Sequence, residues 1–288
     1  MVGLVFVDHH THVFSEQARR VVSAAIGREL DSFAGRELCS AIANAGVLKA
    51  VVLSVAYMHR EADAVSAEND WVAAECDSDE RLIPFFSVNP LADAALAEIE
   101  RCARSGVFAG LKLHLANSGV NLLDEVHRRQ VGRVLASAQS LGMPTVVHLR
   151  ASATFTVAHV DAFIVEAVAA APDCPIQFAH LGGWGGYDAA TQEVLGRLRR
   201  AIADGRPFYL DVSAVVRGAD LDPYRSLAAD LKGIPSDRLL FGTDWPDWTA
   251  HHYLESLKTV GVSEPVKRFE TTRQDSFCAS ASLGVGLL

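Results

Sequence analysis

Hydrophobic and polar positions alternate along this chain between two kinds of segment. Eight short runs are apolar on both alternating faces and rich in β-branched residues, as expected of strands buried in a parallel sheet. The segments between them carry apolar residues at helical spacing. The eight predicted strands span residues 3–8, 50–56, 82–88, 109–115, 144–149, 175–181, 207–213 and 238–244.

Three of the intervening segments predict helices most clearly. The first, 91–105, is rich in Ala, Leu and Glu and ends before Gly106, a residue type that commonly follows a helix. The second, 124–141, has one apolar face and is also followed by glycine. The third, 189–203, repeats the pattern with arginines toward its C-terminal half, where cations suit the helix dipole.

Strands that alternate with helices predict an α/β fold, and eight strands with helices between them predict a single closed (β/α)₈ TIM barrel over residues 1–288. An open doubly wound sheet is the alternative. It is disfavoured because the polar residues that end the first, middle and last strands would be spread across a wide sheet, whereas closure joins the first and eighth strands. We expect 13–37 to form a helical excursion over the barrel mouth, while the tail at 264–288 carries little structural signal.

Composition narrows the class of protein. The formal charge of −9, from 26 basic and 35 acidic residues, argues against a general binder of nucleic-acid phosphates. There is no signal-peptide pattern and no run of about 20 apolar residues that could span a membrane. Five scattered cysteines without a CxxC pair indicate reduced thiols in a cytoplasmic protein. The expected partner is therefore a small-molecule substrate, with no nucleic acid and no membrane, and homo-oligomerisation is left open.

Four of the predicted strands end in residues that can bind a metal. The first runs into His10 and His12, which are two residues apart and so share one face of a strand. The others run into His148, His180 and Asp244. Imidazole and carboxylate are the ligands of catalytic zinc sites that keep a position open for water. Each residue alone has a structural alternative, a core histidine or a turn-capping aspartate, but their joint arrangement favours a metal site.

The order of these motifs resembles the amidohydrolase superfamily, in particular the amidohydrolase 2 branch of metal-dependent TIM-barrel hydrolases, including lactonases and related decarboxylases. The resemblance covers residues 3 to about 260, and the order and spacing of the motifs carry it. The matching segments are Asp8–His12 (D-x-H-x-H), Gly110–His114 (G-x-K-x-H), Val147-His148, His180–Gly183 (H-x-G-G) and Gly242–Pro246 (G-T/S-D-W/Y-P).

The resemblance implies one divalent ion held by His10, His12, His148 and Asp244, with Zn²⁺ as the first choice and Mn²⁺ or Fe²⁺ as alternatives. Such an ion polarises a carbonyl group and makes water a better nucleophile near neutral pH. Beside it, His180 would act as an acid/base, stabilise an oxyanion, or be a direct ligand. Asp244 would also accept a proton.

Relatives that bind two metals bridge them with a carboxylated lysine on the fourth strand. Lys112 lies on the predicted fourth strand, but His114 occupies the strand end, so one ion is favoured over two. The chain also departs from many relatives at its C-terminus. Residues 269–288 lack the Asn-Ala motif of the helix that often closes the barrel bottom.

Other strand ends supply candidates for substrate binding. Arg150, two residues beyond the fifth-strand histidine, would pair with a substrate carboxylate, or else form an ion pair within the protein. Tyr57 and His114 follow the second and fourth strands. Trp184 and Trp245 follow the sixth and eighth, and would either wall a ring-shaped substrate or pack in the rim loops.

The leading hypothesis is a metal-dependent hydrolase that cleaves an ester, lactone or amide of a small, carboxylate-bearing molecule. The Asp-Trp-Pro form of the last motif resembles lactone hydrolases and favours lactones. A non-oxidative decarboxylase of the same superfamily is the alternative. A third hypothesis, of another class, is an inactive barrel that binds a small molecule.

Overall fold

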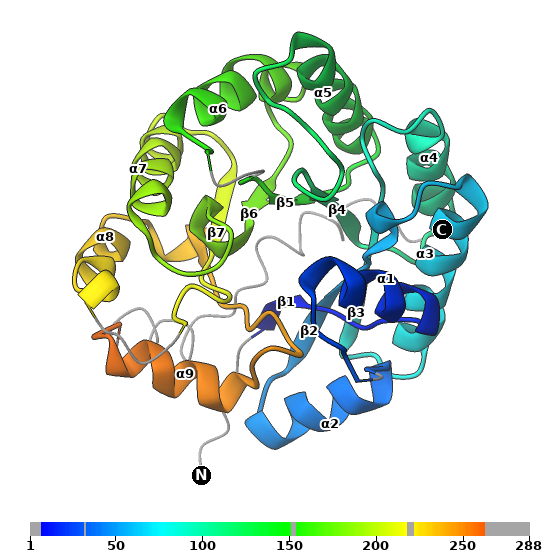
Figure 1. The fold of residues 1–288 in the computed structure, drawn as a ribbon, viewed down its shortest axis with the longest axis horizontal. Helices are drawn as coiled ribbons and strands as arrows, with labels where there is room; N and C mark the ends of the chain where they lie inside the picture. The colour runs from blue at the N-terminus through cyan, green and yellow to red at the C-terminus, as the bar shows by residue number, and fades with distance from the viewer. Residues whose placement is uncertain (1–6, 32, 151–153, 218–221, 263–288) are drawn as a thin grey trace, which may run out of the picture.

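The computed structural model describes residues 7–31, 33–150, 154–217 and 222–262. Eight parallel strands follow one another in sequence order around the sheet, with helices on the outside (Figure 1). The strands are β1 (Val7–Thr11), β2 (Lys49–Leu53), β3 (Leu82–Ser87), β4 (Gly110–His114), β5 (Thr145–His148), β6 (Ile176–Phe178), β7 (Phe208–Asp211) and β8 (Leu239–Leu240). The predicted TIM barrel is therefore confirmed.

The helices that connect the strands lie around the barrel. The α-helices are α1 (Glu16–Ile26), α2 (Gly35–Ala45), α3 (Ala62–Asp77), α4 (Ala95–Ser105), α5 (Glu125–Ser140), α6 (Val157–Ala162), α7 (Ala189–Ala203), α8 (Leu227–Lys232) and α9 (Ala250–Thr259). The short helices are η1 (Ala56–Met58), η2 (Phe163–Ala167, a π-helix), η3 (Val168–Ala170), η4 (Ala179–Gly182), η5 (Asp222–Tyr224) and η6 (Ser236–Arg238).

Contacts between the last and first strands bring the barrel close to full closure. The His9 amide donates to the Phe241 carbonyl at 2.9 Å, and the Asp244 amide donates to the His10 carbonyl at 2.8 Å. Asp8 adds a side-chain link, because its carboxylate accepts hydrogen bonds from the amide and the hydroxyl of Thr243. Burial raises the pKa of Asp8 to about 7, against these hydrogen bonds.

Several predicted bounds are shifted in the structure. The strands predicted at 175–181 and 238–244 span only Ile176–Phe178 and Leu239–Leu240. Two further shifts have a clear cause. The first strand continues through Thr11 rather than ending at residue 8, because its backbone pairs with β2 and with the segment after β8; residues 3–6 of the predicted strand lie outside the described part. Helix α4 begins at Ala95 rather than 91. Asn89 accepts a hydrogen bond from the Leu91 amide, so a turn occupies the expected helix start.

The barrel interior is filled in two levels. An apolar cluster plugs the lower part. Its buried members are Val7, Val51, Leu53, Phe85, Val146, Tyr209 and Leu240. On β4, Leu111 and Leu113 belong to the outer core against the helices, while Lys112 and His114 line a cavity above the plug. Strand alternation thus separates core residues from cavity residues.

The expected excursion over the mouth is present as helix α1, which lies in front of strands β1 to β3 in Figure 1. Ser15 caps its N-terminus by accepting a hydrogen bond from the Ala18 amide. Phe14, Leu30 and Tyr57 belong to the small apolar cluster that joins this region to η1. Helix α1 is therefore held over the barrel by its own packing.

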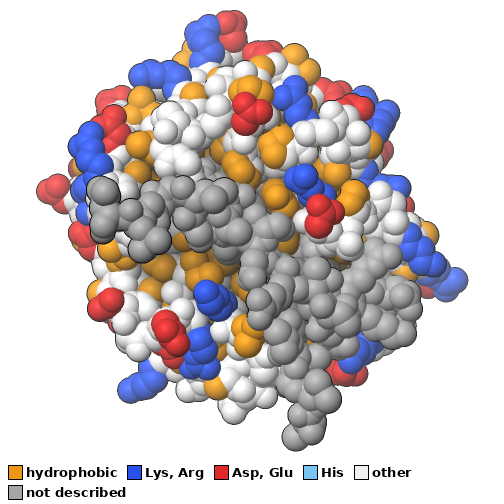
Figure 2. Space-filling view, turned by 180° about the vertical axis from the view of Figure 1, so that it is seen from behind, with side chains coloured by type: hydrophobic (Ala, Val, Ile, Leu, Met, Phe, Trp, Pro, Cys, Tyr) orange, Lys and Arg blue, Asp and Glu red, His pale blue; other side chains and the backbone are white. Residues whose placement is uncertain are grey.

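Figure 2 shows the opposite face, where basic, acidic and apolar side chains are interspersed wherever described residues reach the surface. No helix among the described residues has the length and apolarity needed to cross a membrane. Cys39, Cys76, Cys102 and Cys174 are all free thiols, and Cys278 lies outside the described residues. The predicted tail at 264–288 also lies outside them.

Candidate metal centre and active site

A cavity of about 450 Å³ opens at the barrel mouth, lined by residues that follow the strands and by helix α1. Active sites of TIM barrels lie at this end, where the strand-to-helix loops meet. The lining includes a set of titratable and aromatic residues: His10, His12, Tyr57, Lys112, His114, His148, His180, Trp184, Arg217, Asp244, Asp247 and Arg28.

His10 of β1 and His12, which directly follows this strand, turn the same ring nitrogen toward Asp244. His10 Nδ1 lies 3.1 Å from the Asp211 carboxylate, and His12 Nδ1 lies 2.9 Å from the Leu53 carbonyl. Both partners are acceptors, so each Nδ1 carries the proton and each Nε2 keeps its lone pair. The two Nε2 atoms each lie 3.5 Å from Asp244 Oδ1.

This donor set fits a divalent metal ion. The ligand atoms of His10, His12 and Asp244 all lie within 4.8 Å of one another. Neutral imidazole and ionised carboxylate are the forms that bind metals. Burial lowers the pKa of His10 to about 4, which keeps the ring neutral. Burial opposes ionisation of Asp244, but the neighbouring histidines, His180 first, hold its pKa well below the usual value.

His180 lies beside this centre with its ring fixed. Its Nδ1 is 2.7 Å from the Ser213 carbonyl, which can only accept, so Nε2 is left unprotonated. Its ring centroid is 4.8 Å from that of His10. The geometry suits a proton acceptor and equally a ligand, because His180 also belongs to a second group of converging ligand atoms with His10 and Asp211.

His180 and Asp244 both adopt left-handed backbone conformations, with φ of 55° and 64°. This region is unfavourable for residues other than glycine, and such strain concentrates at functional sites. The conformation is held by hydrogen bonds: the His180 amide donates to Asp211 at 3.0 Å, and the Asp244 amide donates to the His10 carbonyl. The backbone therefore places both side chains at the rim.

Asp211 organises the centre from below, and we did not select it from the sequence. It is fully buried at the end of β7 and accepts hydrogen bonds from His10, Gln177, Ser213 and the His180 amide. Burial opposes its ionisation, but the adjacent His10 holds its pKa well below the usual value. The rule used for Asp244, an acidic residue that ends an apolar strand, would have selected it.

His148, at the end of β5, also lines the cavity. Its ring stacks on His114 with centroids 4.0 Å apart and lies 5.0 Å from His180. Its nitrogens belong to neither group of converging ligand atoms found among the described residues. The structure thus brings His10, His12 and Asp244 together and leaves His148 farther from them. Burial lowers the pKa of both His114 and His148.

Lys112 lies on the cavity floor, where only 1% of its surface is exposed. Its Nζ has no hydrogen-bond partner among the described residues. Burial lowers the pKa of its ammonium group to about 8.

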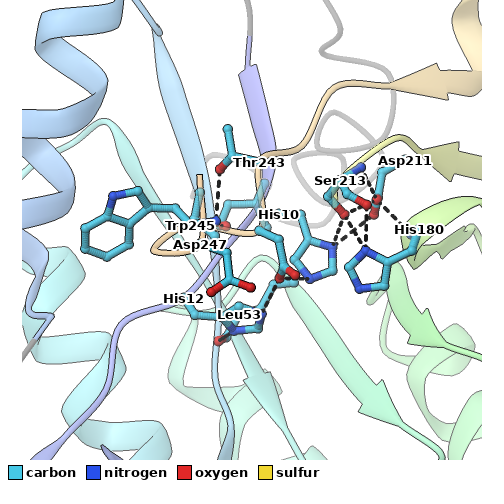
Figure 3. Close-up of polar contacts among 12 residues, drawn as sticks. His10, His12, Leu53, His180, Asp211, Ser213, Thr243, Trp245 and Asp247 are labelled. Atoms are coloured by element: carbon cyan, nitrogen blue, oxygen red, sulfur yellow. Dashed lines mark hydrogen bonds and ion pairs between the residues drawn. The ribbon is translucent and has the colours of Figure 1, made fainter. Parts of the chain in front are cut away.

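The predicted substrate-binding residues divide into two groups. Tyr57, His114 and Trp184 line the cavity, as expected. Trp245 does not: it is buried against Phe33 with ring centroids 5.2 Å apart, and in Figure 3 it points away from the histidines.

Arg150 is not among the cavity-lining residues either. Its Nη1 donates to both oxygens of Asp188 at 2.9 and 2.8 Å, and its guanidinium lies 5.3 Å from the Trp184 ring centroid. The arginines that do line the cavity are Arg28 and Arg217, which flank Asp247. All three residues lie in irregular loops that follow strands or helices, where neither Arg28 nor Asp247 belongs to a periodic pattern.

The fold and rim describe a TIM barrel whose mouth carries two histidines and an aspartate in an arrangement that fits a divalent metal ion. The amidohydrolase profile matches residues 7–272, nearly the whole chain. The chain belongs to the amidohydrolase family, as the resemblance predicted. A dihydroorotase from Synechococcus sp. (strain CC9902) is 32% identical over 136 residues, which are 42% of this chain and 38% of that protein.

Solved structures share the fold at low sequence identity. The IDCase of Metarhizium anisopliae in its apo form has a TM-score of 0.68 at 15% identity, covering 96% of this chain and 97% of that one. A probable 2-pyrone-4,6-dicarboxylic acid hydrolase from Acinetobacter baumannii, with citric acid bound, has 0.63 at 14% over 92% and 95%. A dihydroxybenzoic acid decarboxylase from Polaromonas sp. JS666, with manganese and 2-nitroresorcinol, has 0.60 at 17% over 97% of each chain.

Proposed function

We propose that the protein is a metal-dependent hydrolase that cleaves an ester, lactone or amide of a small carboxylate-bearing molecule. The observation that carries this proposal is the convergence of His10, His12 and Asp244 at the barrel mouth, with His180 beside them. One divalent ion, Zn²⁺ first, would be held by these three ligands with His148 as a fourth. When bound, the ion supplies Lewis-acid polarisation of a carbonyl group and lowers the pKa of water.

The protein's own groups would then orient the substrate and move protons. Asp244, ionised in the cavity, accepts a proton from the attacking water, and His180 donates to or accepts from the leaving oxygen or nitrogen. The Asn117 amide donates to His114 Nδ1 at 3.3 Å, so neutral His114 carries its proton on Nε2 and can donate to a substrate oxygen. Tyr57 and Trp184 wall the substrate.

Decarboxylation is the second candidate. Two of the similar structures described above are a decarboxylase with bound manganese and an IDCase, and the same ring of histidines could hold a carboxylated substrate. The buried Lys112 ammonium favours an anionic group deep in the cavity, since it has no anionic hydrogen-bond partner among the described residues.

Product analysis separates the two candidates. Purified protein, analysed for metal, is incubated with a panel of lactones and aromatic acids before and after treatment with a chelator. Consumption of added base at constant pH, without CO₂ release, supports the hydrolase, because hydrolysis of an ester or lactone releases an acid. CO₂ release supports the decarboxylase. Full activity in protein that contains no metal would contradict both.

A further inference from the structure

The outer part of the cavity carries a cluster of charges that the proposed reaction does not use. Arg28, Arg217 and Asp247 come from three separate segments: the loop after α1, the loop after β7 and the loop after β8. Arg28 Nη2 lies 2.9 Å from Asp247 Oδ1, and Arg217 Nη2 lies 3.4 Å from Asp247 Oδ2. The cluster holds two positive charges and one negative charge.

Arg217 links this cluster to the metal centre. Its Nη2 lies 3.6 Å from Asp244 Oδ2 as well as close to Asp247. An anion on Arg217 would therefore sit within one side-chain length of the proposed ion. Because a bound metal would take up the charge of Asp244, Arg217 would then have less negative charge beside it and would attract an anion more strongly.

The protein fixes the Arg217 guanidinium in place. Its Nε donates to the Ala214 carbonyl at 3.3 Å. Its plane lies against Gly185, where an added Cβ would come within 3.0 Å of Nε and 3.1 Å of Cζ. Gly185 also has φ of 95°, a backbone conformation that favours glycine. Both this conformation and the close approach of Arg217 therefore require glycine at this position. A guanidinium held in this way is preorganised for a bidentate partner.

Stability alone gives little reason for the cluster. The side chains of Arg28, Arg217 and Asp247 are 62%, 47% and 33% exposed, and exposed ion pairs typically contribute about 0–1 kcal/mol. Each guanidinium carries five N–H donors, whereas the described hydrogen bonds use only part of them. Some N–H groups of the two arginines can therefore donate to a ligand at the cavity mouth.

The rest of the outer wall is apolar. Helix α1 and its neighbours contribute Phe14, Val22, Ala25, Leu30 and Met58 to the lining. A ligand that reaches the metal centre would pass an apolar surface on one side and the two arginines on the other.

We propose that Arg28 and Arg217 form the carboxylate subsite of this cavity and that Asp247 occupies it until a ligand carboxylate takes its place. The ligand class is a small acid with an apolar body, whose carboxylate lies beside the group that faces the metal centre. This inference rests on the proposed function, and it transfers to Arg217 and Arg28 the role that the sequence suggested for Arg150.

The test measures binding of benzoate and citrate by calorimetry, with benzamide as the neutral match to benzoate. It uses the protein both as purified with its metal and after chelator treatment. Arg28→Gln and Arg217→Gln should each weaken binding of the acids about ten-fold or more, equivalent to about 1.4 kcal/mol, and leave benzamide unchanged. Asp247→Asn should tighten binding of the acids, because it removes the competing carboxylate.

Two further variants sharpen the result. Arg20→Gln, on the exposed side of α1, is the matched control and should change nothing. Arg150→Gln tests the alternative arginine. The inference would be overturned if the acids do not bind at all, or if Arg28→Gln and Arg217→Gln leave their binding unchanged. It would also be overturned if Arg150→Gln abolishes the binding instead, or if Asp247→Asn weakens it. Arginine-dependent acid binding that persists in metal-free, inactive protein would uphold the subsite while the proposed reaction fails.

Discussion

Asp211 and His10 form a buried pair in which the Asp211 carboxylate, 3.1 Å from His10 Nδ1, fixes the opposite nitrogen of the ring toward the cavity. Partners of this kind orient metal-binding histidines and raise their basicity. The same carboxylate accepts a hydrogen bond from the His180 amide, so it positions two strand ends at once. The proposed metal site therefore depends on β7 as well as on the strands that carry its candidate ligands.

The first prediction concerns this pair. Asp211→Asn should weaken metal binding about 10–100-fold, the usual effect of removing such a partner, because His10 loses the acceptor that fixes its tautomer. The affinity is measured by competition with a chromogenic chelator. Asp230→Asn, which removes a carboxylate bonded to Tyr187 on the outside of the barrel, is the control and should bind metal normally. Equal affinity in the two variants would show that Asp211 does not orient a ligand.

A second prediction uses a matched pair of glycines. An added Cβ at Gly242 would lie 2.8 Å from the Cβ of His10, whereas nothing lies within 4 Å of one at Gly196 in α7. Gly242→Ala should displace His10 and reduce both stability and metal affinity. Gly196→Ala should stabilise the protein by about 0.5–1 kcal/mol, since alanine favours a helix interior. Urea unfolding and metal titration of both variants check this, and normal metal binding by Gly242→Ala would contradict it.

The sequence predicted the barrel and much of its rim because both depend on periodicity. Apolar runs locate parallel strands, and the residue that ends a strand lies at the mouth. His10, His12, His180 and Asp244 line the cavity for that reason. Asp211 escapes this rule because it lies inside the predicted strand at 207–213, whereas β7 ends at Asp211 in the structure.

The rule of alternation fails beyond a strand end. Alternation along β5 would turn Arg150, two residues beyond His148, toward the cavity, but that strand stops at His148, and Arg150 forms an ion pair with Asp188. Trp245 follows Asp244, whose left-handed φ redirects the chain, and its ring enters the core. Arg28 and Asp247 lie in loops, where contacts are set by the folded structure and leave no pattern in the sequence.

The buried Lys112 gives a prediction on pH dependence. Burial lowers its pKa from 10.5 to about 8 in the folded protein. Because the pKa of Lys112 is lower in the folded state than in the unfolded state, folding is favoured most when the lysine is neutral in both states, above the unfolded pKa. This stability is lost as the pH falls through the folded pKa. Below about pH 8 the buried ammonium should therefore cost up to about 3 kcal/mol, and this cost should disappear between about pH 8 and 10.5.

Lys112→Met isolates that contribution from other titrating groups. In metal-free protein, the variant should be more stable than the original at pH 7, and the difference should shrink as pH rises to 10. Urea unfolding of both proteins at each pH measures it. A difference that stays constant would mean that Lys112 is neutral or paired throughout.

Metal analysis of the same variant should still give about one ion per chain, whereas two ions in the original and none in the variant would make Lys112 a bridging ligand.

The last prediction separates chemistry from metal binding at His180. Its Nδ1 is engaged by Ser213, and its unprotonated Nε2 is the group available to move a proton. His180→Asn keeps a polar side chain but removes the titratable ring, so turnover should fall about 10²-fold or more while metal content persists. His127→Asn, on α5 outside the cavity, is the control and should retain full turnover. Loss of the metal together with activity would instead make His180 a ligand, and it would move the site toward His10, His180 and Asp211, the second group of converging ligand atoms.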